Sequence, residues 1–147
     1  MSESRRNYCY EFPRPAVTVD LVVVSRENEP RVLLIKRKSE PFAGVWAIPG
    51  GFVEMEEPLE VAVRRELKEE TGIEVGVIEQ LATFGDPGRD PRGRTISVVY
   101  IGSVDPSTVK PKAADDALEV GWHRFAQLPP LAFDHDKILA CARDYLG

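Results

Sequence analysis

The sequence predicts an α/β fold in which a mixed β-sheet is sandwiched between helices. Three observations lead to this class. Short β-branched segments outnumber helical ones, one helical segment lies in the middle of the chain, and a second one ends it. The length of 147 residues suits one domain with a sizeable core and is too short for two ordinary domains. We therefore expect a single α/β domain over residues 1–147.

Strands are predicted where short apolar runs are bounded by turn-forming residues. The first two runs are separated by the turn-like stretch 25–30, so they are expected to form a hairpin. A third, very short run ends at the Pro-Gly-Gly sequence 49–51. The six predicted strands are residues 16–24, 31–37, 44–48, 73–84, 95–102 and 118–125.

Two helices are predicted from periodicity and end signals. The first spans residues 58–71, because Pro58 suits a first helical turn and Gly72 is typical of a helix end. The second runs from His135 to about Leu146, with Asp134 expected as its N-cap.

The charge is concentrated in one stretch. The chain carries 24 acidic and 19 basic residues, a net charge of −5. Residues 51–74 hold eight of the acids and three of the bases, which gives −5, and the remaining 16 acids and 16 bases cancel. This balance argues against a protein that coats nucleic acid, since such proteins usually carry a basic surplus.

Other sequence features exclude several further classes. Cys9 and Cys141 are too sparse for a disulfide scaffold, which favours reduced thiols. Residues 1–14 are polar and lack the apolar core of a signal peptide. The longest aliphatic run, residues 21–24, is far too short to cross a bilayer. We expect a cytoplasmic protein with no membrane partner.

The central helix places carboxylates on the side that should be buried. Glu66 and Glu70 are four residues apart and fall beside the apolar stripe, and Glu69 falls on its flank. The stripe consists of Leu59, Val63 and Leu67. Like charges at this spacing repel, partly buried carboxylates are poorly solvated, and the helix dipole disfavours anions in the last turn.

A hard divalent cation would relieve all three penalties, because Mg²⁺ takes oxygen ligands and shares them with substrate phosphates. The alternative is a solvated acidic face held by pairs such as Glu60 with Arg64, which explains Glu60 well but leaves Glu66 and Glu70 unexplained.

The spacing of these residues resembles the Nudix box, placed at residues 51–73. The matching positions are Gly51, Glu57, Arg65-Glu66-Leu67, Glu69-Glu70 and Gly72-Ile73. The preceding segment 46–51 (WAIPGG) is also similar to the lead-in of Nudix hydrolases. The resemblance implies the Nudix-type α/β/α sandwich, a mixed sheet between helices.

The resemblance also implies roles for residues of the box. Glu66, Glu69 and Glu70 would be metal ligands, Glu57 would assist, and a carbonyl of Gly50 or Gly51 would join the metal shell. Arg65 would hold the carboxylates through ion pairs. The implied cofactor is Mg²⁺, with Mn²⁺ as the alternative, and the implied chemistry is attack of a metal-activated water on a diphosphate. Glu69 is a candidate for the base.

Two segments outside the box, residues 84–94 and 131–135, look like those of small Nudix proteins grouped with ADP-ribose pyrophosphatases. Arginine suits phosphate and carboxylate groups, so the first segment offers three candidate substrate-binding residues; the alternative is a solvated loop with internal Asp–Arg pairs. Arg37 is a fourth candidate or an exposed strand-end charge, and Asp116 is a candidate ligand or base or a turn residue. The loop arginines are Arg89, Arg92 and Arg94.

Aromatic and histidine side chains carry weaker signals. Trp46, Trp122 and Phe84 suit either stacking on a nucleobase or, more commonly, packing in the core. His135, at the start of a helix, is expected to be structural.

The favoured function is Mg²⁺-dependent hydrolysis of ADP-ribose, a small-molecule nucleotide, to AMP and ribose 5-phosphate. One alternative is a housecleaning hydrolase of nucleoside triphosphates. Another is a non-catalytic nucleotide sensor, although no DNA-binding domain is expected in a chain that ends at Gly147. The sequence leaves the oligomeric state open, and a homodimer is suggested by analogy alone.

Overall fold

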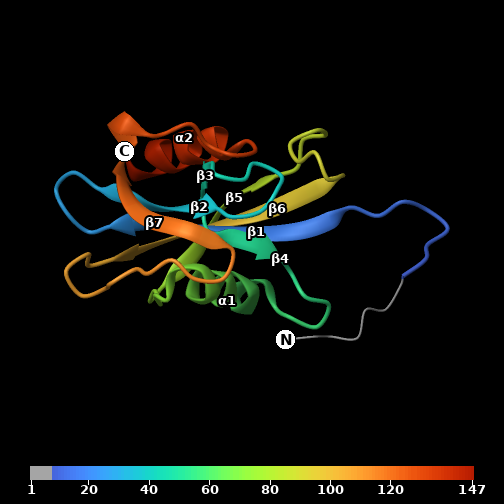
Figure 1. Cartoon of the computed structure of the whole chain (residues 1–147), viewed down its shortest axis with the longest axis horizontal. Helices are drawn as coiled ribbons and strands as arrows, with labels where there is room; N and C mark the ends of the chain where they lie inside the picture. The colour runs from blue at the N-terminus through green and yellow to red at the C-terminus, as the bar shows by residue number, and fades with distance from the viewer. Residues whose placement is uncertain (1–7) are drawn as a thin grey trace.

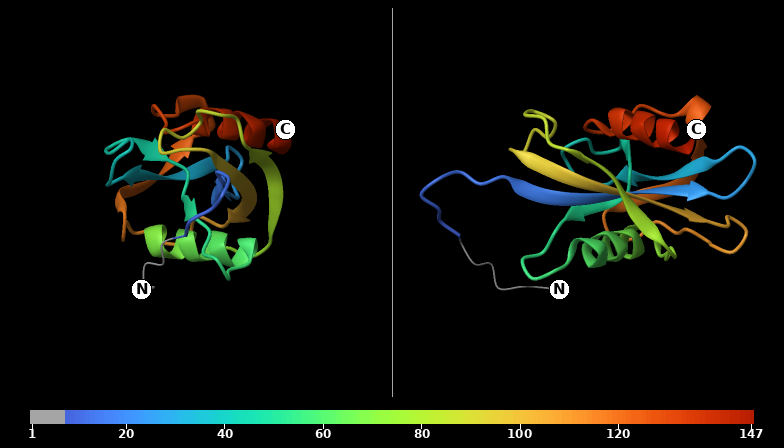
Figure 2. Two further views of the ribbon diagram at one scale, coloured as in Figure 1. Left: turned by 90° about the vertical axis from the view of Figure 1, so that its right-hand side faces the viewer. Right: turned by 180° about the vertical axis from the view of Figure 1, so that it is seen from behind.

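The computed structural model describes residues 8–147 and has three layers. Helix α1 covers one face of the sheet and helix α2 covers the other (Figure 1), and the end-on view in Figure 2 shows the sheet between them. The predicted sandwich is therefore confirmed. The elements are β1 (Ala16–Ser25), β2 (Arg31–Arg37), β3 (Trp46–Ala47), β4 (Gly50–Phe52), α1 (Leu59–Thr71), β5 (Ile78–Phe84), β6 (Thr95–Val104), β7 (Ala117–Arg124), a 3₁₀ turn η1 (Phe125–Gln127) and α2 (His135–Leu146).

The sheet is mixed, with the order β3-β2-β1-β6-β5, and β4 pairs with β1 while β7 pairs with β2. Strands β1 and β6 run parallel from Ala16↔Thr95 to Ser25↔Val104, and the other pairs are antiparallel. Strands β1 and β2 pair at Val24↔Val32, near the turn that joins them. Further from that turn, β1 pairs instead with β4 at Asp20↔Gly50. This exchange of partners places the Gly50–Gly51 backbone beside the middle of β1.

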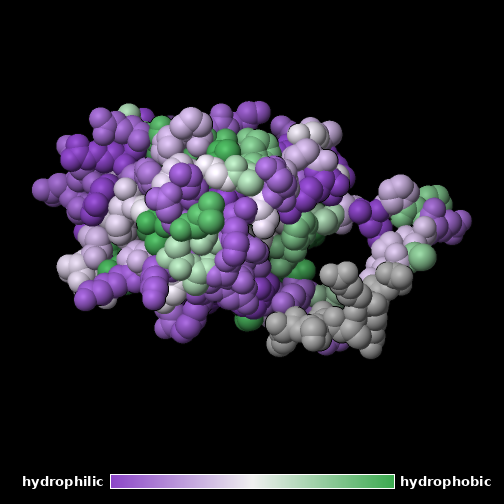
Figure 3. All heavy atoms as spheres, in the orientation of Figure 1, coloured by the Kyte–Doolittle hydropathy of each residue, from purple (hydrophilic) through white to green (hydrophobic). Residues whose placement is uncertain are grey.

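Alternation along β1 divides the core between the two helices. Val19 and Leu21 belong to the cluster under α1, whereas Val22 and Val24 belong to the cluster under α2. This follows from the period of two in a strand that is buried on both faces. Polar residues cover most of the face seen in Figure 3, and hydrophobic side chains gather over β7. No helix in residues 8–147 is both long and apolar enough to span a membrane.

The predicted elements agree with the observed ones except around the Pro-Gly-Gly sequence 49–51 and at residues 73–77. The predicted strand 44–48 shrinks to β3, and Gly50–Phe52, expected to end a strand, forms β4. The predicted strand 73–84 begins only at Ile78, because Ile73 and Val75 are buried from an irregular segment beside α1. The first helix begins one residue later than predicted, and the hairpin and the second helix are confirmed.

Asp134 occupies the N-cap position of α2, as predicted, but its side chain makes no capping hydrogen bond. It accepts instead two hydrogen bonds from Arg89, from Nε at 2.9 Å and from Nη2 at 2.7 Å. A bidentate guanidinium is a stronger partner for a carboxylate than a single backbone N–H.

Candidate active site

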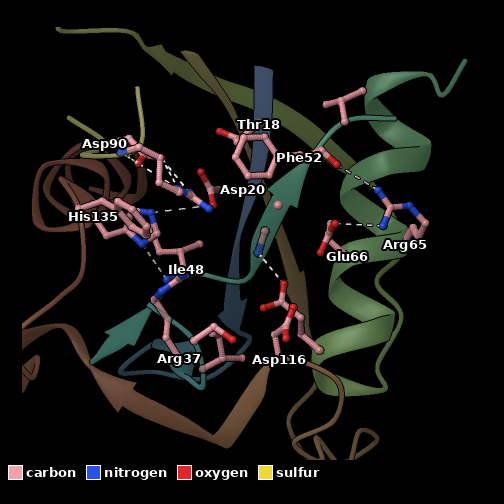
Figure 4. A pocket seen from close by; sticks show the side chains of 18 of the residues that line it. Thr18, Asp20, Arg37, Ile48, Phe52, Arg65, Glu66, Asp90, Asp116 and His135 are labelled. Carbon is pink, nitrogen blue, oxygen red and sulfur yellow. Dashed lines mark hydrogen bonds and ion pairs between the residues drawn. The ribbon is translucent and has the colours of Figure 1, made fainter. Parts of the chain in front are cut away.

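A cavity of about 460 Å³ opens beside β4, and both α1 and the first residue of α2 contribute to its lining. Its lining carries both acidic and basic side chains, and Figure 4 shows Glu66 and Arg37 on different sides of β4. We call Glu54, Glu66 and Glu70 the carboxylate half and Arg37, Arg89 and Arg92 the arginine half. A cavity of this size with converging polar groups suits a small-molecule ligand.

The carboxylate half is partly buried, as the helical periodicity predicted. Glu70 is 6% exposed, and its Oε1 accepts a hydrogen bond of 2.9 Å from the Gly50 N–H. Burial, and then the neighbouring Glu66, raises the pKa of Glu70 well above its ordinary value. Burial also raises the pKa of Glu66, although Arg65 offsets part of the effect. The two carboxylates therefore lie close together with incomplete charge compensation.

Arg65 is the cation that holds the other carboxylates of the box. It forms a two-point contact with Glu57, through Nε at 2.6 Å and Nη2 at 2.9 Å. Its Nη1 donates to Glu66 at 3.0 Å and to Glu69 at 3.2 Å. These bonds lower the pKa of Glu57 and raise that of Arg65. The placement matches the role that the Nudix resemblance implies.

Only some of the predicted metal ligands therefore face the cavity. Glu66 and Glu70 line the cavity with Gly50 and Gly51, whereas Glu69 and Glu57 do not line it. Glu69 is the most exposed of these acids, with 45% of its side chain accessible. Within residues 8–147, no three His, Cys, Asp or Glu side chains form a ready cation cage.

The residues present fit a hard divalent cation that draws its remaining ligands from water and substrate. Mg²⁺ usually binds in that way, through one or two carboxylates plus phosphate oxygens. The donors are carboxylate oxygens whose pKa values are raised, mainly by burial and in addition by neighbouring acidic groups. Gly51 leaves room beside them, since a Cβ there would lie 2.5 Å from the Glu66 carboxylate.

The arginine half is mostly paired before any ligand binds. Arg89 is buried against Asp134, with 5% and 12% of the two side chains exposed. Arg92 forms bidentate contacts with Asp90, and these outweigh the effect of burial and lower the Asp90 pKa. An Asp–Arg pair within the loop, which the sequence offered as an alternative, is thus present for Arg92, whereas Arg89 pairs with Asp134 outside the loop; both arginines also line the cavity.

Arg37 differs from these two arginines. Its Nε donates to the Pro41 carbonyl at 2.8 Å, and its guanidinium lies 5.0 Å from the Phe133 ring centroid. Burial and the nearby Arg92 lower its pKa. Because arginine remains charged in proteins, Arg37 brings a cation with no carboxylate bonded to it in the described chain.

The structure does not bring Arg94 to the site. Arg94 is exposed and lies outside the cavity lining. Asp116 does line it, and its backbone carbonyl accepts from Lys38. The aromatic candidates Trp46, Trp122 and Phe84 pack against the core clusters instead. The aromatic residues of the cavity are Phe52 and Phe133, whose rings lie 4.7 and 5.4 Å from the Arg92 guanidinium.

Sequence reasoning missed several cavity residues. Asp20 is 6% exposed at the centre of β1 and accepts a hydrogen bond from Ser97. Its only sequence signal was a charge in an otherwise uncharged strand, since residues 16–25 contain no other. Phe52 was missed because it lies on an unpredicted strand, whereas Phe133 falls within the segment 131–135 but was not expected to line the cavity.

Comparison with known proteins agrees with this geometry. The family profile of the NUDIX domain matches residues 14–141. The chain is 48% identical over 135 residues to the ADP-ribose pyrophosphatase of Methanocaldococcus jannaschii, covering 92% of this chain and 75% of that protein. It is 34% identical to the ADPR responsive transcriptional repressor NtrR of Acinetobacter baylyi, covering 88% of this chain and 53% of the repressor.

Solved structures give the same result. The NUDIX domain of Shewanella oneidensis NrtR, in complex with ADP ribose, superimposes with a TM-score of 0.86 and 34% identity. That match covers 96% of this chain and 95% of the other. A MutT/nudix family protein from Enterococcus faecalis gives 0.85 and 36%, covering 95% and 65%. With the box, the sandwich and these relatives in agreement, the chain belongs to the Nudix family and is a pyrophosphohydrolase of that family.

Proposed function

We propose that this protein hydrolyses ADP-ribose to AMP and ribose 5-phosphate with a divalent cation, Mg²⁺ by preference and Mn²⁺ as the alternative. The observation that carries the proposal is that one cavity is lined both by two carboxylates without full charge compensation and by several arginines. The carboxylates suit a cation and the arginines suit a diphosphate. The archaeal relative named for this activity supports the choice of substrate.

Each residue has a proposed role. Glu66 and Glu70 hold the cation with a carbonyl of Gly50 or Gly51, while Glu57 and Glu69 assist at the rim. A bound cation lowers the pKa of water and neutralises charge on the diphosphate. Arg65 orients Glu66 and keeps Glu57 and Glu69 from moving freely. Arg37 binds the diphosphate, while Arg89 and Arg92 shape that end of the cavity.

The base that takes the proton from water has two candidates. Glu69 belongs to the box but lies outside the cavity lining, whereas Asp116 lines the cavity. A base must first lie within reach of the water, so position favours Asp116. Separate Glu69→Gln and Asp116→Asn variants, compared through their pH–rate profiles, would distinguish them: the base is the one whose loss removes the acidic limb.

The substrate is tested with a coupled phosphate-release assay across ADP-ribose, other nucleoside diphosphate derivatives and nucleoside triphosphates, with Mg²⁺ present. We expect ADP-ribose to give the highest kcat/KM. Activity confined to triphosphates would replace the proposal with the housecleaning function.

A second candidate function is ADP-ribose sensing without turnover. It is favoured by the similarity to the NtrR repressor and to the NrtR domain that was solved with ADP ribose. Calorimetric binding of ADP-ribose without hydrolysis at any cation concentration would select this function over catalysis.

A further inference from the structure

The buried imidazole of His135 lies between two segments that build the active site. His135 is the first residue of α2 and is 4% exposed. Its Nδ1 accepts a hydrogen bond of 3.0 Å from the Ile48 backbone N–H. An acceptor nitrogen carries no proton, so the ring proton of the neutral imidazole lies on Nε2. That nitrogen is 3.9 Å from Asp20 Oδ1, and Figure 4 shows the ring between the two partners.

Ile48 lies in the crossover between two strands that have different partners. Strand β3 pairs with β2, and β4 pairs with β1, so residues 48–49 connect the two parts of the sheet. The Pro49 carbonyl accepts from Leu21 at 3.0 Å, while Ile48 donates to His135. The side chain of His135 therefore fixes the crossover from the α2 side of the sheet.

The next residue after the crossover sets the position of Glu70. The Gly50 N–H donates to Glu70 Oε1 at 2.9 Å. A Cβ at Gly50 would overlap Asp20 Oδ1, so the Asp20 carboxylate packs directly behind this backbone. A shift of the crossover would therefore turn the N–H that holds Glu70 in place.

We propose that His135 is a positioning residue for hydrolysis, which acts through the Ile48 N–H and the Gly50 N–H to orient Glu70. The inference rests on the proposed function, because the effect is measured on turnover of ADP-ribose. Outer-shell partners of this kind typically contribute about 10- to 100-fold to activity. A purely structural histidine would contribute to stability alone.

The test compares substitutions that differ in their hydrogen-bonding atoms. Asparagine offers an oxygen near the position of Nδ1, whereas glutamine and alanine do not. We expect His135→Gln and His135→Ala to lower kcat about 10- to 100-fold with KM nearly unchanged, and His135→Asn to restore most of kcat. Leu139→Ala, which loosens the buried side of the same helix but keeps the imidazole, is the matched control and should lower Tm without changing kcat.

A second readout does not depend on turnover. In the metal-free protein, we expect the amides of Ile48 and Gly50 to exchange with deuterium faster in His135→Gln than in the wild type or in His135→Asn. If wild-type protein fails to hydrolyse ADP-ribose, the proposed function fails, whereas unchanged Gly50 exchange in His135→Gln overturns the positioning role.

Two further results would overturn the inference. One is a His135→Gln protein with lower Tm but full kcat, and the other is a His135→Asn protein as impaired as His135→Ala. If the variants do not fold, the ¹⁵N chemical shifts of the wild-type imidazole decide. A proton on Nε2 supports the inference, and a proton on Nδ1 overturns it.

Discussion

The two halves of the cavity differ in how far their buried charges are compensated by partners of opposite charge. The arginine half is assembled in advance, since Arg89 and Arg92 each have a carboxylate partner. The carboxylate half is left incomplete, because burial and repulsion raise the pKa values of Glu66 and Glu70. Substitutions of the paired arginines, Arg89 and Arg92, should therefore affect stability first, whereas those in the carboxylate half should affect catalysis and can stabilise the metal-free fold.

Within the carboxylate half, we expect Glu70→Gln to have the largest effect on catalysis. Glutamine keeps an oxygen for the Gly50 N–H and removes the charge that faces Glu66. Metal-assisted stabilisation contributes several kcal/mol, so kcat should fall about 10³-fold. The free energy of unfolding without metal should rise. Turnover assays and denaturant titrations measure the two effects, and a near-normal rate would mean that the cluster is structural.

Breaking the arginine half at Arg89 should cost stability. Arg89→Ala leaves the Asp134 carboxylate almost buried without its partner, which should lower the free energy of unfolding by about 3 kcal/mol. Urea unfolding monitored by circular dichroism measures the loss. Arg94→Ala is the matched control, since Arg94 is exposed and should change stability little. An equal loss of unfolding free energy in Arg89→Ala and Arg94→Ala would contradict the role of the Arg89–Asp134 pair in stability.

Substitution of Arg37 should weaken the binding of ADP-ribose. Arg37 lines the cavity without a bonded carboxylate, so Arg37→Ala should raise KM for ADP-ribose about 10-fold and change stability less than Arg89→Ala does. Steady-state kinetics test this, again with Arg94→Ala as the control. An unchanged KM would assign the diphosphate to another group.

The smallest expected effect concerns pH. In the metal-free protein the raised pKa of Glu70 means that the folded state binds its proton more tightly than the unfolded state. This group should therefore lower stability as pH rises from about 4.5. The lowered pKa of Glu57 acts the other way, and its contribution is lost as pH falls below about 4.5. Unfolding curves across pH measure both slopes, and Glu70→Gln should flatten the first.

The part of the site that the sequence could predict lies mainly on one regular element, helix α1. The helical period placed Glu66 and Glu70 on the buried side of α1, and local periodicity is enough to find such residues because they belong to one continuous helix. The role of Arg65 was implied instead by the resemblance to the Nudix box.

The rest of the site depends on contacts between distant segments. Asp20 and His135 meet only because β1 and the start of α2 lie on either side of the crossover. Local rules placed Asp134 at the N-cap but missed the partner of its side chain, Arg89, which is 45 residues away. The Pro-Gly-Gly sequence 49–51 was expected to end a strand, and only pairing with β1 makes Gly50–Phe52 a strand.

The parallel pairing of β1 with β6 has a consequence for synthesis of the chain. Residues Ala16 and Thr95 pair although they are 79 positions apart, 95 minus 16. At about 5–20 residues per second, a ribosome needs roughly 4–16 s to make the intervening chain. During that time the aliphatic run of β1 lacks its longest partner, and such unpaired strands are prone to aggregate. The nascent chain is thus prone to aggregate from the time that β1 has been made until β6 is available to pair with it.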